Sequence, residues 1–301
     1  MENKNQLPEL MSIIIPNLNS PLIGEVIKAI KQEVNNHPCE IIVVGKDKWN
    51  ILQHYSEDIK FIDTIHPIGA GRARNIGIEQ SNGNWLFFID ADCIPQQNWM
   101  ENLIRRMQEG WNVVGGGVKS DDENFWPLVY NIAMFHEFFI SKRKEIKKYL
   151  PTLNLAVKRE VMNKVGLLNE DLRRCEDLEW TLRMTQSGYR LIFEPTAAIL
   201  HKPIDLSFKR LKDIFYTDGF YSIQNRIKFK KLYKMPEILG HSLVWKLLSS
   251  LISAYTTLKI FITTQEFRNN LSTIPSVYIL KFCWCLGAAE GLKAMDNKSI
   301  S

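Results

Sequence analysis

Strand-like and helix-like segments alternate through the first part of the chain. Short runs of β-branched and aromatic residues, typical of buried strands, occur at 11–15, 40–44, 60–62 and 85–89. Segments with helical character lie at 21–35, 70–81 and 96–108. Repeated units of this length imply parallel strands that are joined by helices. The alternation predicts an α/β fold with a Rossmann-like, doubly wound, mostly parallel sheet.

The pattern loosens beyond residue 112. There we expect a strand at 113–114 that enters a tight turn at Gly115–Gly117, a helix over 124–148, strands at 153–157 and 190–193, and a helix over 176–187. From about residue 205 the sequence indicates helices only. We therefore predict a catalytic domain over residues 10–204 and an all-helical C-terminal extension over residues 205–301.

Two apolar helices are expected near the C-terminal end, at 242–263 and 275–292. Each is interrupted by charged residues, namely Lys246, Lys259, Lys281 and Glu290. A membrane-spanning helix needs about 20 nearly uncharged residues. A pair of helices in the membrane interface fits better, anchored by Trp245, Tyr255 and Trp284. Packing of both helices on the catalytic domain is the alternative, and the sequence leaves both open.

The formal net charge of +5 is unevenly distributed, with basic residues gathered at 141–148 and 226–231. Such runs are commonly solvated faces. An anionic membrane surface is the functional alternative, because each basic residue gains on the order of 1 kcal/mol there. The chain has no recognisable nucleic-acid-binding module, so we expect no nucleic acid as a partner.

The cysteines and the N-terminus indicate the compartment. Cysteines 39, 93, 175, 283 and 285 match neither a zinc-site spacing nor a secreted disulfide framework, which indicates a reducing environment. Residues 1–8 lack the apolar core of a signal peptide. We expect a cytoplasmic protein, peripheral at the inner face of the membrane if its helices bind lipid.

Asp90-Ala91-Asp92 follows the apolar run Phe87-Phe88-Ile89. Two carboxylates at this point cannot both face a dry core, because burying unpaired charge is costly. Ligands of doubly wound sheets gather beyond the carboxyl ends of the strands, which is where Asp90 falls. Hard oxygen ligands suit Mg²⁺ or Mn²⁺, with phosphate oxygens filling the remaining positions. Asp-x-Asp is also frequent in ordinary loops, so the tripeptide needs support from elsewhere.

A Gly/Arg-rich segment, Gly69–Gly77, lies one helix and one strand upstream of Asp90. Its glycines permit close backbone approach at a helix start, which favours anions, and Arg72 and Arg74 add donors for phosphate. A plain glycine-punctuated turn is the alternative for this segment alone. Joined to the aspartate pair, it favours phosphate binding.

Two further elements carry titratable groups. Glu176 and Asp177 begin a predicted helix, where acidic residues are also normal partners of the helix dipole. His201 follows Ala197-Ala198-Ile199-Leu200, and a lone histidine is more often structural than a ligand.

Taken in this order, the pieces resemble an inverting family 2 glycosyltransferase with a GT-A fold. The matching strings are Ile14-Ile15-Pro16-Asn17-Leu18-Asn19, Ala73-Arg74-Asn75-x-Gly77, Phe88-Ile89-Asp90-Ala91-Asp92-x-x-Pro95, Asn154-Leu155-Ala156-Val157, Glu176-Asp177, Gly188-Tyr189-Arg190 and His201. The resemblance covers about residues 11–201, and the combination is far more specific than any one member.

The resemblance implies a role for each matched residue. Asp92 would bind a Mg²⁺ or Mn²⁺ cofactor, and His201 would make a further metal or diphosphate contact. Asp90 would lie near the ribose and diphosphate of the donor, and Arg74 beside its nucleotide. Asp177 would be the general base, with Glu176 raising its pKa. The remaining donor-binding residues would be Pro16, Asn19, Asp47, Gly71, Asn75 and Glu176.

The expected reaction moves one sugar from a nucleotide-diphosphate sugar to the hydroxyl of a glycan, a lipid-linked or another acceptor. The family's second strand usually ends in an acidic pair that contacts the nucleobase, normally uracil, whereas here Gly45-Lys46-Asp47 follows Val44. Asp47 is the candidate for that contact from a shifted position. The Gln-x-x-Arg-Trp pattern of processive members is absent, which favours transfer of a single sugar.

Three other functions compete with this one. A degenerate relative that binds a sugar nucleotide without turnover would fit the unusual Gly45-Lys46, but the retained Asp90, Asp92, Asp177 and His201 argue against it. A nucleotidyltransferase would show a basic, glycine-rich loop after the first strand, where Pro16–Asn19 stands instead. A dinucleotide-dependent oxidoreductase would show Gly-x-Gly-x-x-Gly there.

Overall fold

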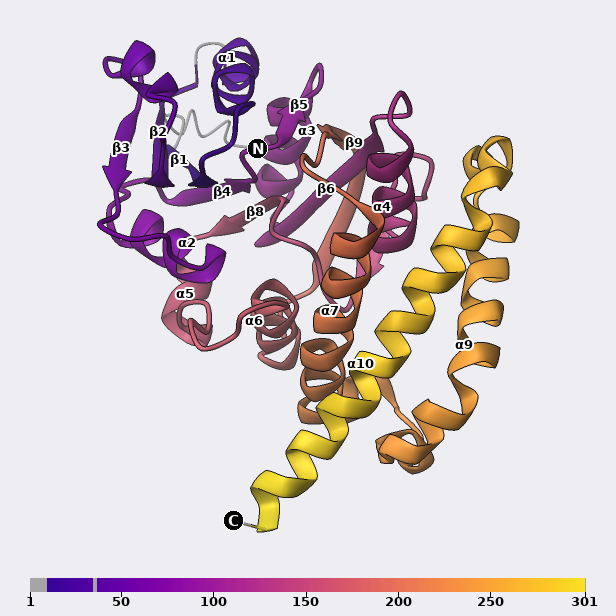
Figure 1. Ribbon diagram of the computed structural model, residues 1–301. Coiled ribbons are helices and arrows are strands. Elements are labelled where there is room, and N and C mark those ends of the chain that lie inside the picture. The colour runs from indigo at the N-terminus through magenta and orange to yellow at the C-terminus, as the bar shows by residue number, and fades with distance from the viewer. Residues whose placement is uncertain (1–9, 35–36, 301) are drawn as a thin grey trace.

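The computed structural model describes residues 10–34 and 37–300, so the stretch 1–8, on which the expectation about a signal peptide rests, lies outside the described residues. In this described part, nine strands form one sheet in the order β3-β2-β1-β4-β8-β6-β9-β5, and β7 pairs with β9 (Figure 1). Helices pack on the sheet, and a further group of helices lies beside it. The predicted α/β fold with a mostly parallel sheet is confirmed.

Four strands make the parallel half of the sheet: β1 (Met11–Leu18), β2 (Cys39–Lys46), β3 (Lys60–Asp63) and β4 (Trp85–Ile89). Helices α1 (Ile23–Val34) and α2 (Ala70–Glu79) cover opposite faces of it. Ile41 and Val43 belong to the apolar cluster that contains α1, whereas Ile42 and Val44 pack around Ala73 of α2. Alternate strand residues point to opposite faces, so both faces are buried and each strand is apolar throughout.

The other half of the sheet reverses direction at β8 (Asn154–Lys158), which is antiparallel to both β4 and β6 (Val113–Ser120). Strand β9 (Leu191–His201) runs parallel to β6, and the short β5 (Cys93–Pro95) runs antiparallel to β9. Three helices connect these strands: α3 (Trp99–Gln108), α5 (Glu160–Val165) and α6 (Glu176–Gln186). A short 3-10 helix, η1 (Ile51–Tyr55), precedes β3.

The glycines at 115–117 do not make the predicted turn, because β6 runs straight through them. A Cβ on Gly116 would lie 2.2 Å from the carbonyl oxygen of Ala197, and one on Gly117 would lie 2.4 Å from that of Pro195. The pairing with β9 shifts register between these two glycines. They are therefore needed for close approach of the neighbouring strand, a requirement that is set by residues 80 positions away and is invisible locally.

The predicted helix over 124–148 is wrong in its second half. Helix α4 covers Phe125–Phe135, and β7 (Glu145–Lys147) then pairs with β9. The basic residues of this stretch suit an edge strand, because charge on an edge opposes pairing with other chains.

Beyond His201 the described residues form helices only. These are α7 (Phe208–Lys228), α8 (Lys230–Tyr233), η2 (Glu237–Gly240), α9 (Ser242–Thr263), η3 (Gln265–Thr273) and α10 (Ile274–Ile300). Helix α10 lies along α7 at backbone distance. A Cβ on Gly219 would meet the carbonyl oxygen of Trp284 at 2.0 Å, and one on Gly287 would meet that of Tyr216 at 1.9 Å.

One helical stretch among the described residues, 265–297, is long and apolar enough to cross a membrane, with a hydropathy of 1.3. Its close packing on α7 gives part of this apolar surface a protein partner. Trp245 and Trp284, which we predicted as membrane anchors, pack against each other with ring centroids 5.6 Å apart, and Trp245 is buried. Tyr255 is exposed. Of the three predicted anchors, the structure thus leaves only Tyr255 fully available to lipid.

Candidate active site

Asp92 and His201 are brought together by strand pairing. Strand β4 ends at Ile89, so Asp90 is the first residue beyond the buried sheet, and the chain then turns back as β5. Antiparallel pairing sets Cys93 of β5 opposite His201 of β9. As a result, Nε2 of His201 lies 3.7 Å from Oδ1 of Asp92. The Ser20 hydroxyl donates to the carbonyl of Ala91 at 2.7 Å and ties this turn to the start of α1.

The proton of the His201 ring can be assigned from its surroundings. The amide nitrogen of Asn131 donates to the Ser120 hydroxyl and to the His201 carbonyl, each at 3.1 Å. The amide oxygen of Asn131 therefore faces Nδ1 of His201, 2.6 Å away, and accepts its proton. In the neutral ring this leaves the lone pair on Nε2, directed to the side of Asp92. Metal-binding histidines are commonly oriented in this way by a group behind the ring.

Side-chain atoms of Asp92, Cys93 and His201 lie within 4.8 Å of one another. Burial and the nearby Asp92 raise the pKa of the Cys93 thiol well above its ordinary value, so it stays protonated and is a poor ligand. Burial acts to raise the pKa of Asp92, but the positive charge of His201 in its protonated form, and the hydrogen bond from that ring, outweigh burial, so the pKa is lowered. A carboxylate oxygen and an imidazole nitrogen fit Mn²⁺ or Mg²⁺, whose other positions can take water and phosphate oxygens.

Arg74 links the aspartate turn to α6. Its buried guanidinium donates through Nη2 to Oδ1 of Asp90 at 2.6 Å and through Nη1 to Oε1 of Glu176 at 2.9 Å. Burial raises the pKa of Asp90, and Arg74 offsets only part of that effect. Gly71 leaves room for this arrangement, because a Cβ there would lie 3.1 Å from Cγ of Glu176.

Asp177 stands next to this ion-paired cluster, in the first turn of α6. Its Oδ1 accepts the N–H of Leu178 at 2.7 Å. Burial, and then the adjacent charge of Glu176, raise the pKa of Asp177 to about 7. A carboxylate with such a pKa can accept a proton near neutrality, which is what general-base catalysis needs.

Helix α7 holds the turn that leads into α6. Arg174 forms a two-pronged ion pair with Asp218, and the amide of Asn225 donates to the carbonyl of Cys175 at 3.1 Å. Cys175 has a left-handed backbone, with φ of 60°, and directly precedes Glu176. The position of Asp177 thus depends on contacts from the helical region.

The residues after Val44, where the sequence departs from the family pattern, extend strand β2 and do not form a loop. Gly45 and Lys46 are the last residues of β2 and pair with Asn17 and Leu18, which makes Asp47 the first residue beyond that strand. Gly45 has φ of 137°, and a Cβ there would lie 1.9 Å from the carbonyl oxygen of Asn17, so no other residue fits.

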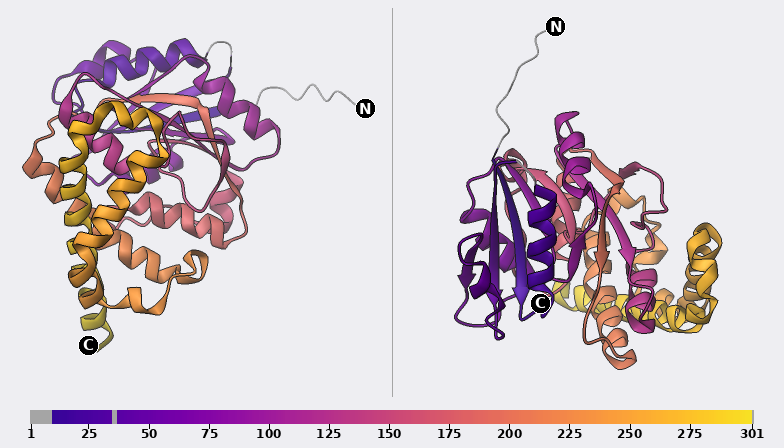
Figure 2. Two further views of the ribbon diagram at one scale, coloured as in Figure 1. Left: turned by 90° about the vertical axis from the view of Figure 1, so that its right-hand side faces the viewer. Right: turned by 90° about the horizontal axis from the view of Figure 1, so that it is seen from above.

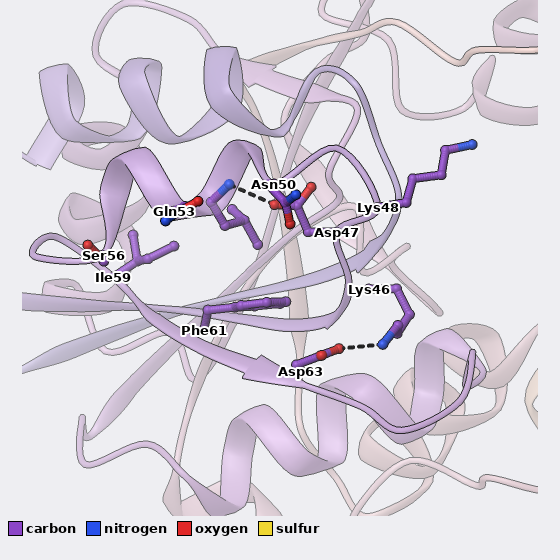
Figure 3. A pocket seen from close by; sticks show the side chains of 10 residues that line it. Lys46, Asp47, Lys48, Asn50, Gln53, Ser56, Ile59, Phe61 and Asp63 are labelled. Atoms are coloured by element: carbon purple, nitrogen blue, oxygen red, sulfur yellow. Dashed lines mark hydrogen bonds and ion pairs between the residues drawn. The ribbon is translucent and has the colours of Figure 1, made fainter.

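Asp47 lines a pocket of about 540 Å³, together with Lys46, Lys48, Asn50, Leu52, Gln53, Ser56, Ile59, Phe61 and Asp63 (Figure 3). One oxygen of Asp47 accepts the N–H of Leu52 at 2.7 Å, and the other is buried with no hydrogen-bond partner among the described residues. Lys46 pairs with Asp63 at 2.8 Å at the rim. Asp47 and the Phe61 ring thus line the same pocket, and a buried acceptor without a partner at its edge points to a ligand there.

The other predicted donor residues differ in their contacts. Asn19 has a left-handed backbone, and its side-chain oxygen accepts the N–H of Lys48 at 2.7 Å, so it joins the ends of β1 and β2. Pro16 lies within β1, partly buried, opposite Val44. The amide of Asn75 is taken up by the backbone of Leu168 and the carboxylate of Glu170, so Asn75 fastens that loop.

Sequence reasoning missed Asn131, Asp218 and Asn225. Each is a buried polar residue that lies among apolar residues on a helix face. That pattern was the available signal, because a buried polar group needs a partner. This pattern indicates that each residue has a hydrogen-bond partner, but it does not identify the partner.

Comparison with known proteins identifies the family of the chain. The glycosyl transferase family 2 profile matches residues 12–166. Glycosyltransferase AglE of Haloferax volcanii is 34% identical over 297 residues, which is 93% of this chain and 93% of that protein.

Two solved structures share the fold. The mannosyltransferase PcManGT from Pyrobaculum calidifontis, solved with GDP-Man and Mn²⁺, superposes with a TM-score of 0.57 at 15% identity, over 99% of this chain and 77% of that one. TarS of S. aureus gives a TM-score of 0.51 at 17% identity, over 69% of this chain and 39% of that one. The GT-A fold, the matched profile and the AglE similarity together show that the chain belongs to glycosyltransferase family 2 and is a glycosyltransferase.

Proposed function

We propose that this glycosyltransferase moves one sugar from a nucleoside-diphosphate donor to an acceptor hydroxyl with inversion at the anomeric carbon. The observation that carries the proposal is the position of Arg74, which is paired with both Asp90 and Glu176. This buried ion pair network ties the aspartate turn at the end of β4 to the helix that carries Asp177. A diphosphate-binding turn and a base of suitable pKa are thereby held in one rigid unit.

In the proposed step, Asp177 takes the proton of the acceptor hydroxyl. The acceptor oxygen forms a bond to the anomeric carbon as the bond from that carbon to the diphosphate oxygen breaks. The electron pair of the broken bond leaves with the nucleoside diphosphate, and one displacement inverts the configuration. A pKa of Asp177 near 7 keeps the carboxylate basic enough to accept the proton while leaving a substantial fraction ionised at neutral pH.

Asp92 and His201, with Asp90 nearby, would hold the Mg²⁺ or Mn²⁺ cofactor. When bound, such a cation offsets charge that develops on the departing diphosphate. Asn131 accepts the proton of Nδ1 and so leaves Nε2 as the nitrogen of the neutral His201 ring that would bind the metal. The unpaired oxygen of Asp47 and the ring of Phe61 would receive the nucleobase, with Pro16 and Asn19 shaping the neighbouring strand end.

We further propose that uridine is the nucleoside of the donor, with guanosine as the competitor that the PcManGT complex suggests. The absence of Gln-x-x-Arg-Trp supports a non-processive reaction. Residues 10–204 would form the catalytic domain and 205–301 the extension. The acceptor would be a glycan or lipid-linked glycan of the cell envelope, and the enzyme would act in the cytoplasm, at the inner face of the membrane.

Asp177→Asn tests the assignment of the base. Donor affinity with Mn²⁺, followed as the shift in melting temperature across UDP- and GDP-sugars, should stay as in the unaltered protein, because a bound ligand stabilises the native state by mass action. Release of nucleoside diphosphate should fall by roughly 100-fold or more, the usual contribution of a positioned base. Asp171→Asn, an exposed carboxylate on the preceding loop, is the matched control. Full turnover by Asp177→Asn would remove it as the base, and donor binding without turnover by the unaltered chain would favour a binding protein.

A further inference from the structure

Helix α9 shows large apolar side chains on its outer face. Six of them recur at helical spacing along most of its length and are 59–72% exposed: Leu243, Leu247, Leu251, Tyr255, Leu258 and Ile262. At a rise of 1.5 Å per residue the row is about 28 Å long. Such a contiguous exposed row is not ordinary surface, because single exposed apolar residues are common but long patches mark interaction sites.

The inner face of α9 carries polar residues where a helix exposed to water would carry apolar ones. In its middle, the buried residues are Ser249, Ser253 and Thr257, which face α10. The Ser253 hydroxyl donates to the carbonyl of Ser249 at 2.6 Å and lies 3.6 Å from Sγ of Cys285. A helix at a water interface buries its apolar face. Helices that face lipid show the opposite pattern, with small and polar residues toward the protein and leucine on the outer face.

No other part of the described chain covers this row. Figure 1 shows α9 as the outermost element on the right, with α10 between it and α7, and the view from above in Figure 2 again places it at the edge farthest from β1–β3. The main packing partners of α9 are α10, η2 and η3, and its buried Ile260 and Phe261 join the apolar cluster that contains residues of α4.

The charges beside the row point to one occupant. Lys259 is exposed beside the apolar row, directly after Leu258. Lys246 is exposed near the start of α9, three residues before the buried Ser249, and α9 contains no acidic residue. A second copy of the chain in a two-fold contact would bring this basic helix against itself with no carboxylate of α9 to pair its lysines. Anionic lipid headgroups would pair them, and long lysine side chains reach headgroups from the edge of an apolar face.

We propose that the outer face of α9 is a membrane-docking surface, on which the helix lies flat in the interface of an anionic bilayer. Helix α10, despite its length and hydropathy, would stay on the protein side as the support of α9, since its backbone is locked against α7 at Gly219 and Gly287. The inference rests on the membrane part of the proposed function and not on the transfer chemistry.

The test is flotation of the full-length protein with vesicles of phosphatidylcholine alone and of phosphatidylcholine mixed with phosphatidylglycerol. The unaltered protein should float with the anionic vesicles. Leu247→Ser/Leu251→Ser should weaken that binding by at least about tenfold, because binding scales with buried apolar area. Ile65→Ser/Ile146→Ser, two exposed aliphatic residues on the other part of the chain, is the matched control and should float normally.

A second pair of substitutions separates the charge from the apolar face. Lys246→Gln/Lys259→Gln should lower the affinity for anionic vesicles by about fivefold for each lysine and reduce its dependence on salt. Binding of Leu247→Ser/Leu251→Ser as tight as that of the unaltered protein would overturn the proposal. So would a dimer of the unaltered protein that ignores vesicles and dissociates in this variant.

The two proposals can fail separately. Donor-induced melting shifts in detergent should be the same in Leu247→Ser/Leu251→Ser and in the unaltered protein, and they report only on the active site. Flotation without any donor response would leave the docking surface standing and reject the proposed donor chemistry. A donor response without flotation would do the opposite.

Discussion

Glu176→Gln should move the acidic limb of the pH–rate profile to lower pH. In the native protein, burial and the charge of Glu176 raise the pKa of Asp177 to about 7, while Arg74 opposes them. Only ionised Asp177 can accept a proton, so kcat/KM should rise with pH through about 7 and level off above it. Glutamine removes the adjacent negative charge but keeps an oxygen for Arg74, and Arg74 then acts more strongly on the remaining carboxylates.

The size of the shift follows from these charges. The two carboxylates are neighbours in the first turn of α6, partly withdrawn from water, where a like charge shifts a pKa on the order of one unit or more. One unit corresponds to about 1.4 kcal/mol of differential interaction. We therefore expect the limb to move downward by about one pH unit, and kcat/KM at pH 6 to lose less of its plateau value than in the unaltered enzyme.

The assay is release of nucleoside diphosphate from the donor at saturating Mn²⁺ between pH 5 and 9, with water as acceptor where no glycan acceptor has been identified. Asp171→Asn supplies the control for loss of a carboxylate on the same segment, and its limb should not move. An unchanged limb in Glu176→Gln, or one that moves upward, would refute the reasoning, because removal of a negative neighbour cannot raise the pKa of a carboxyl by direct charge interaction.

Three further changes test other contacts. Asn131→Leu should weaken the Mn²⁺ response of donor turnover by roughly 10- to 100-fold. Asn131→Asp should keep that response, because its side chain still accepts from Nδ1 of His201. Equal Mn²⁺ titrations for the two variants would contradict the role of Asn131 in orienting His201. Asp218→Ala should lower the free energy of unfolding in urea by about 2 kcal/mol, since the half-buried Arg174 loses its charged hydrogen-bond partner. An unchanged midpoint would show that the pair is inert. Gly45→Ala should cost about 1–3 kcal/mol in the same measurement, and retained stability would mean that β1 and β2 can separate there.

The elements that could be predicted from the sequence are those whose pattern is local. Strand β4 was expected at 85–89 and α9 at 242–263, and both have these bounds in the structure, because continuous apolar runs with clear ends specify them. Strand β7 has three residues and no periodicity, and only its pairing with β9 makes it a strand. The glycines of β6 predict a turn when read locally, because the close neighbours that require them come from β9.

The residues of the candidate site can also be divided into those with a local sequence motif and those without one. Asp90, Asp92, Asp177 and His201 are predicted as site residues because short motifs surround them, and their roles stay a prediction. Asn131 was not found, because its partner His201 is 70 residues away and no local pattern records the contact. Asp218 was missed for the same reason, with Arg174 lying 44 residues before it. Roles that depend on long-range partners need the fold before they can be read.

The close contact between α7 and α10 also bears on the order in which the chain folds during synthesis. Asp218 and Asn225, which hold the turn before Asp177, lie on α7, and Gly219 and Tyr216 of the same helix are in backbone contact with α10. The ribosome delivers α7 well before α10, so the nascent sheet can form while α7 still lacks its neighbour. The helix that supports the turn before Asp177 therefore gains its own packing partner last. In the proposed membrane-docked enzyme, α9, which is made between α7 and α10, is then also in place.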